Sequence, residues 1–75
     1  MVRVIVEFSE GKVKPVRFWR GMREYEVKNV PMIFERSDGG RKYMCFAVDT
    51  GGMMAELAMD CQSYQWSVVS CQSND

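Results

Sequence analysis

Four short turn signals divide this chain into segments of β-strand length. They are Arg20-Gly21-Met22, Asp38-Gly39, Gly51-Gly52 and the run from Asp60 to Ser63. Residues of these types supply the positive φ angles that tight hairpins need. Apolar and polar residues alternate on both sides of each turn, which is typical of half-buried strands. The chain is therefore expected to be all-β, an antiparallel meander of six or seven short strands.

The length and the single apolar face together limit the architecture. A chain of 75 residues is expected to form one domain, residues 1–75, with a frayed polar tail at 70–75. Short strands that share one apolar face must curl to keep that face from water. We therefore expect a small, partly open barrel of the SH3-like kind rather than a flat sheet.

Pairing the residues around each turn predicts which side chains share the core. A Gly51-Gly52 loop places Phe46 opposite Leu57, and a four-residue loop at 60–63 places Leu57 opposite Trp66. Because these turns give the same face independently, their agreement supports the fold. The expected inner face comprises Val16, Phe18, Tyr25, Val27, Ile33, Met44, Phe46, Val48, Ala55, Leu57, Met59, Tyr64, Trp66 and Val68.

Three places leave the local structure open. The hairpin around Gly21 allows either Arg20-Gly21 or Gly21-Met22 as its loop, although both registers put the same side chains inward. Pro31 cannot donate to a ladder, so it indicates a strand start, a bulge or an edge. The segment 53–59 contains good helix formers, but its pairing partners on both sides favour a strand.

The composition excludes several classes of protein. Ten cationic and ten anionic residues cancel, which argues against a non-specific polyanion binder, and the chain has no histidine to act as a general base or metal ligand. Three cysteines without a CxxC pair indicate a reducing, cytoplasmic compartment. No apolar run is long enough for a membrane span. We therefore expect that the protein is not an enzyme and has no catalytic residues. We also expect it to bind no metal, cofactor, membrane or small-molecule substrate.

One hairpin combines cations with an outward aromatic side chain. Residues 1–30 hold seven cationic and four anionic side chains, an excess of +3 that the rest of the chain balances. Cations beside a flat ring suit single-stranded nucleic acid, in which phosphates need charge and bases need a stacking surface. The alternative is structural: the ring covers one end of the barrel and the arginines pair with glutamates. The candidate residues are Arg17, Trp19, Arg20 and Arg23.

A second candidate surface lies on the other face of the strands around the Asp38-Gly39 turn. A two-residue loop there pairs Phe34 with Tyr43 and Ile33 with Met44. The strands are then apolar on both faces, and both faces need cover. The N-terminal strand or a second copy of the protein would supply it. The candidate interface comprises Met32, Phe34, Tyr43, Cys45 and Ala58.

The stretch from Gly11 to Gly21, together with 25–30, resembles a family of short bacterial proteins of unknown function. Their opening reads KPxxFxWRGRxYxVxEV, and their ending, YELxYD…xWxLxxV, is matched loosely by 55–60 and 65–69. The resemblance implies a bacterial cytoplasmic β domain. Some relatives are encoded near translesion DNA-polymerase components, which links the nucleic-acid alternative to DNA repair. The family offers no catalytic residue, and its Trp- and Arg-rich region is replaced here by Pro31-Met32-Ile33-Phe34.

Two functions follow as expectations. The first is a non-enzymatic binding module that recognises a protein partner or forms a homodimer through the Met32 to Ala58 set. The second is weak binding of single-stranded nucleic acid through the cationic hairpin.

Overall fold

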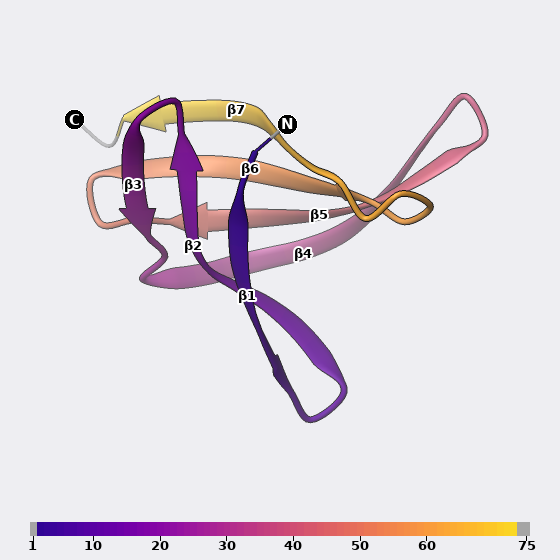
Figure 1. The fold of residues 1–75 in the computed structure, drawn as a ribbon, viewed down its shortest axis with the longest axis horizontal. Helices are drawn as coiled ribbons and strands as arrows, with labels where there is room; N and C mark the ends of the chain where they lie inside the picture. The colour runs from indigo at the N-terminus through magenta and orange to yellow at the C-terminus, as the bar shows by residue number, and fades with distance from the viewer. Residues whose placement is uncertain (1, 74–75) are drawn as a thin grey trace.

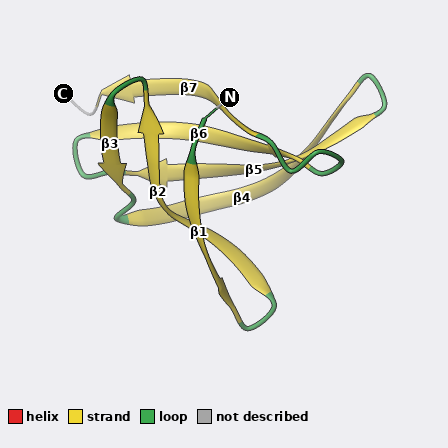
Figure 2. Ribbon diagram, in the orientation of Figure 1, coloured by secondary structure: helices red, strands yellow, loops and turns green. Residues whose placement is uncertain are grey.

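The computed structural model describes residues 2–73, and every regular element in that range is a β-strand. The strands follow one another as an antiparallel meander (Figures 1 and 2). Their bounds are β1 (Val4–Ser9), β2 (Lys12–Arg20), β3 (Arg23–Glu26), β4 (Asn29–Asp38), β5 (Arg41–Asp49), β6 (Met53–Asp60) and β7 (Trp66–Ser73). The all-β meander expected from the turn signals is confirmed.

Two sheets form the two layers of the molecule. Strands β1, β2 and β3 make a three-stranded sheet, and β4, β5, β6 and β7 make a four-stranded sheet. The strands of the first sheet cross those of the second rather than run along them (Figure 1). A single backbone bridge from Val2 to Trp66 and the bond from Lys28 N to Asp49 O join the layers. The sheets are not closed into a full barrel, which confirms the partly open arrangement.

The core lies between the two sheets. The side chain of Phe18, from β2, is fully buried against Phe46 and Val48 of β5 and Ala55 and Leu57 of β6. Phe18 stacks on Tyr25 with 5.2 Å between ring centroids, and Phe46 packs against Trp66 at 5.3 Å. This is the inner face predicted from the turns, with three exceptions: Val16 is displaced by a bulge, Tyr64 lies exposed in the loop between β6 and β7, and Ile33 is exposed at the border of the sheet.

One predicted hairpin register is confirmed, and the structure selects one of the two that were left open around Gly21. The Gly51-Gly52 loop pairs Phe46 with Leu57, as predicted. In the β2–β3 hairpin, Phe18 faces Tyr25, so the loop is Gly21-Met22. Both hairpins have a short loop containing glycine.

The other two registers were wrong. The β4–β5 loop is Gly39-Gly40, which pairs Phe34 with Cys45 instead of Tyr43. The β6–β7 loop is longer than four residues, so Met59 faces Trp66. Next to each turn the error shifts the pairing by two residues, which leaves the side chains on their predicted faces. Beyond Val68 a bulge makes the shift three residues, so that Cys71 pairs with Ala55.

Three ladders within residues 2–73 contain a register shift, and two of these shifts are considered first. The ladder between β1 and β2 shifts its register between Ile5 and Val6, and this shift leaves Val16 without a partner on β1. Pro15 is consequently the residue that becomes fully buried there, in place of the predicted Val16. The second bulge leaves Val69 unpaired on β7, opposite the step from Glu56 to Leu57.

Two other expectations concerned local structure. The segment 53–59 is part of strand β6 rather than a helix, and Pro31 lies in an edge strand beside a register shift. Residues 70–73 were expected to fray, but they extend β7 and pair with β6. The rest of that predicted tail, 74–75, lies outside the described residues.

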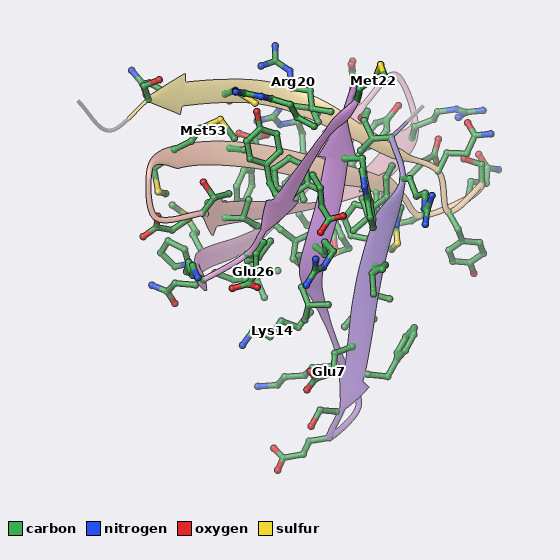
Figure 3. All side chains as sticks on the ribbon, turned by 60° about the vertical axis from the view of Figure 1, so that its left-hand side comes forward. Glu7, Lys14, Arg20, Met22, Glu26 and Met53 are labelled. Carbon is green, nitrogen blue, oxygen red and sulfur yellow. The ribbon has the colours of Figure 1, made fainter. Side chains whose placement is uncertain are left out.

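The far end of the β1–β2 hairpin projects beyond the rest of the molecule. Residues 6–15 form this extension, which we call the arm, and it passes β4 before it turns (Figures 1 and 2). Glu7 and Lys14 lie along it, well away from Arg20 and Met22 at the opposite end of the same sheet (Figure 3). The arm's inward residue Val13 lines an apolar groove of about 390 Å³ with Ile33 and Phe46.

Candidate functional site

The structure brings the predicted interface residues together on one face. We call this the outer face: the side of the four-stranded sheet turned away from the three-stranded sheet. Phe34 is the cross-strand partner of Cys45, which is the partner of Ala58, so these three side chains share a face. Met32 is two residues from Phe34 and Tyr43 is two residues from Cys45, so both lie on the same face. All five predicted residues therefore lie on this face, although the pairing that placed them there differs from the prediction.

The five residues differ in their accessibility. Met32 is 56% exposed, whereas Phe34 and Tyr43 are half-buried, and Cys45 and Ala58 are buried. The exposed end of the outer face is therefore β4, at the border of the sheet. Cys45 and Ala58 lie in the middle strands, where a partner would reach them only through a small hollow of about 210 Å³ that Tyr43 and Val69 also line.

An ion pair that the sequence analysis missed crosses the outer face. Arg36 Nη2 lies 3.0 Å from Glu56 Oε2, and the Arg36 guanidinium carbon is 5.7 Å from the centroid of the Phe34 ring. Glu56 Oε2 is buried, and within residues 2–73 no hydrogen bond of good geometry reaches it, so the ion pair is its main polar contact. Both residues could have been predicted on this face from the sequence, because side chains alternate between the two faces along β4 and along β6.

Cys45 is an inert thiol in these surroundings. Its burial raises its pKa, an effect that the nearby positive charge of Arg36 only partly offsets. A thiol that stays protonated at neutral pH is a poor nucleophile. Cys45 therefore contributes to this face as a small apolar side chain.

The cationic hairpin is only partly available to an anionic ligand. Arg17 forms an ion pair with Glu24 and lies 3.7 Å from a Glu26 oxygen. Lys28 donates a hydrogen bond of 2.8 Å to Glu26, and this bond is the main reason that the pKa of Glu26 lies below its usual value. The charge of Arg17 is thus already balanced by carboxylates of the neighbouring strand β3.

Trp19 and Arg20 lie together beside a residue that the sequence analysis did not single out. The guanidinium carbon of Arg3 is 4.4 Å from the centroid of the Trp19 ring, and Trp19 N donates a 3.0 Å bond to Arg3 O. Arg3, Trp19 and Arg20 line a hollow of about 550 Å³, and no carboxylate lines it. Arg23 is the cross-strand partner of Arg20 but does not line the hollow.

Neither surface provides a metal site or a membrane-crossing segment. Within residues 2–73, no three His, Cys, Asp or Glu side chains gather closely enough to hold a metal ion. The same range contains no helix of the length and hydropathy needed to cross a membrane. Searches among models of protein families, curated proteins and solved structures found no match to the chain. The resemblance to the short bacterial family thus stays a prediction.

Proposed function

We propose that this chain is a non-enzymatic β domain that works by binding another protein. The supporting observation is that the three-stranded sheet packs on only one side of the four-stranded sheet. On the other side, exposed Met32 and half-buried Phe34 lie at the border of the sheet with no covering layer from residues 2–73. An apolar patch beside a charged group such as Arg36 is a common arrangement at protein interfaces.

A photo-crosslinking experiment tests this function directly. p-Benzoylphenylalanine placed at position 32 should capture a protein in cells of the source organism, and mass spectrometry of the adduct identifies the partner or a second copy. The matched control is the same replacement of Met22, a fully exposed methionine at the β2–β3 turn. Equal labelling at both positions, or none at position 32, would contradict the proposal.

A second candidate function rests on the hollow beside Trp19. Two guanidinium groups and an indole without a neighbouring carboxylate suit a phosphate-bearing single strand. Oligonucleotides should quench the fluorescence of Trp19, and the effect should weaken steeply with salt because phosphate contacts release counterions. Trp19→Phe leaves Trp66 as the remaining indole and should abolish the quenching. No quenching of the wild-type chain at low salt would discard this function.

We place the domain in a reducing, cytoplasmic compartment. The support is the set of three free cysteines, Cys45, Cys61 and Cys71. A secreted domain of this size usually carries an even set of disulfides.

A further inference from the structure

The arginines of the three-stranded sheet fall into two groups. Arg17 is neutralised by carboxylates of β3. Arg3, Arg20 and Arg23 lie at the end of the sheet that carries the β2–β3 turn, and within residues 2–73 none of these three side chains forms an ion pair. This end of the sheet therefore holds a cluster of positive charges that the described part of the chain leaves unbalanced.

Two members of this cluster face each other across a hairpin. Arg20 is the cross-strand partner of Arg23, and the two residues flank the Gly21-Met22 loop. Like charges in directly opposed positions destabilise a hairpin, because their side chains start only about 4.5–5.5 Å apart. An anion held at Arg20 would remove this cost. The hairpin thus retains a repulsion that a ligand of opposite charge relieves.

The hollow beside Trp19 has two chemically different sides. Arg3 and Arg20 provide a cationic side, and Val2, Val68 and the Trp19 indole provide an apolar side. The volume of about 550 Å³ lies within the range of small-ligand pockets. A flat ring joined to an anionic group would contact both sides at once, since bases stack on aromatic rings and on arginine guanidinium planes. A nucleotide has this construction.

The amount and the placement of charge favour one phosphate monoester over a run of phosphodiesters. A monoester carries a charge of about −1.5 to −2 at neutral pH, whereas each internal phosphate of a strand carries a single charge. Grooves for single strands follow the backbone with cations over about 4–16 nucleotides. Here Arg17 is already paired with Glu24, and Lys14 lies on the arm at the opposite end of the sheet (Figure 3). The cluster therefore suits one doubly charged group and lacks a track for a longer backbone.

We propose that the hollow beside Trp19 binds a nucleotide that carries a terminal phosphate monoester. Arg20 holds the phosphate together with Arg3, whose guanidinium adjoins the indole, and the base lies against the apolar side. The phosphorylated end of a single strand and a free nucleoside monophosphate share this chemistry. The inference rests on the second candidate function and narrows its ligand from any single strand to a phosphorylated nucleotide.

Calorimetric titration with matched ligands tests the proposal. The ligands are oligothymidylates of one length with a 5′-phosphate, a 3′-phosphate or two hydroxyl ends, together with thymidine 5′-monophosphate and inorganic phosphate. A phosphorylated nucleotide ligand should bind at least about tenfold more tightly than the hydroxyl-ended strand, because hydrogen bonds to a charged group are the stronger ones. Tighter binding of one phosphorylated strand than of thymidine monophosphate identifies a strand end as the ligand, and the reverse order or equal binding identifies the free nucleotide.

Three results of these titrations overturn the inference. Equal, salt-sensitive binding of all three strands does so while leaving single-strand binding in place. Inorganic phosphate that binds as tightly as the phosphorylated nucleotides shows an anion site with no role for the base. Absence of binding by every ligand removes the second candidate function as well.

Two variants locate the phosphate. Arg20→Gln removes a guanidinium from an exposed position, so the chain should fold normally, and its preference for the phosphorylated ligand should fall to about threefold or less. Lys14→Gln removes the same charge from the arm of the same sheet and should leave the preference unchanged (Figure 3). An unchanged preference in Arg20→Gln, or an equal loss in both variants, contradicts the placement of the phosphate in the hollow.

The pH dependence separates the charge of the ligand from that of the protein. A phosphate monoester gains its second proton with a pKa of about 6. The chain has no histidine, no carboxylate lines the hollow, and Arg3, Arg20 and Arg23 stay charged in this range. The preference for the phosphorylated ligand should therefore shrink several-fold from about pH 7 to about pH 5. A preference that stays constant over this range overturns the assignment of a monoester.

Discussion

Asp60, at the end of β6, is ion-paired with Arg41, at the start of β5. The same carboxylate bonds the loop that follows it, because Gln62 N donates to Asp60 Oδ1 at 2.8 Å and Ser63 N at 3.3 Å. Cys61 N also donates to Lys42 O at 2.9 Å. One buried carboxylate thus fixes the β6–β7 loop to the β4–β5 hairpin.

The stability of the fold should therefore depend on the ionised form of Asp60. The Gln62 N–H holds the pKa of Asp60 below its usual value, and Ser63 and Arg41 add to the effect. A lowered folded-state pKa gives stability that is present above the unfolded pKa, about 3.9, and is lost as pH falls through the folded value. We expect Asp60→Asn to lower the free energy of unfolding at neutral pH and to flatten its decline in acid. Urea titrations at several pH values measure both, and Glu7→Gln, at an exposed carboxylate on the arm, should leave the slope unchanged.

Leu57 should carry a large share of the packing energy. It is fully buried between the sheets and contacts residues of both layers. Leu57→Ala removes methyl groups and leaves a cavity, which should cost about 2–5 kcal/mol of unfolding free energy. Chemical denaturation measures the loss. Val69→Ala, at the exposed bulge, is the control and should stay within about 0.5 kcal/mol of wild type; a similar loss at both positions would refute the assignment of the core.

Gly40 should be the more sensitive of two turn glycines. Its φ is 84°, a left-handed conformation that side chains rarely adopt, whereas Gly52 has no positive φ and open space around it. Gly40→Ala should therefore destabilise the chain by about 1–2 kcal/mol. Gly52→Ala should have little effect. Thermal unfolding of the two variants measures the difference, and equal melting temperatures would contradict the turn assignment.

The three thiols should differ in reactivity. Cys45 is fully buried with a raised pKa, whereas Cys61 and Cys71 are half-buried. Iodoacetamide should label Cys61 and Cys71 in the folded chain and should reach Cys45 only after denaturation. Peptide mass spectrometry at increasing times resolves the three sites. Labelling of Cys45 at the same rate as Cys71 would show that the outer face opens freely.

Local patterns in the sequence were sufficient to predict the strands and to predict which face of the sheet nearly every side chain occupies. The Gly51-Gly52 hairpin was placed correctly because the loop predicted there was the glycine pair itself. The Asp38-Gly39-Gly40 segment offers two loops of equal length, so the register was wrong by two residues while the faces were right. At the end of β6, the Asp60 bonds extend the loop, and Tyr64 adopts a positive φ of 61°.

The candidate sites depended on contacts that no local pattern contains. The alternation of side chains placed Cys45 and Ala58 on the outer face. It did not reveal that they are buried, because they lie in the middle strands beside the Arg36–Glu56 ion pair. Arg3 meets Trp19 only because β1 pairs with β2, and this pairing joins residues sixteen positions apart. The bulge at Val16 follows Pro15, and a proline in a middle strand is a signal for a bulge that the prediction of an inward Val16 did not use.

The bulge at Val69 has a consequence for assembly. Open-ended fibril growth by strand addition needs two flat borders, so that each new molecule leaves a fresh template behind it. Here the irregular backbone of β7 and its bridge to Val2 remove one template. A strand arriving at β7 would meet an irregular border, so growth of this kind is disfavoured at that edge of the sheet.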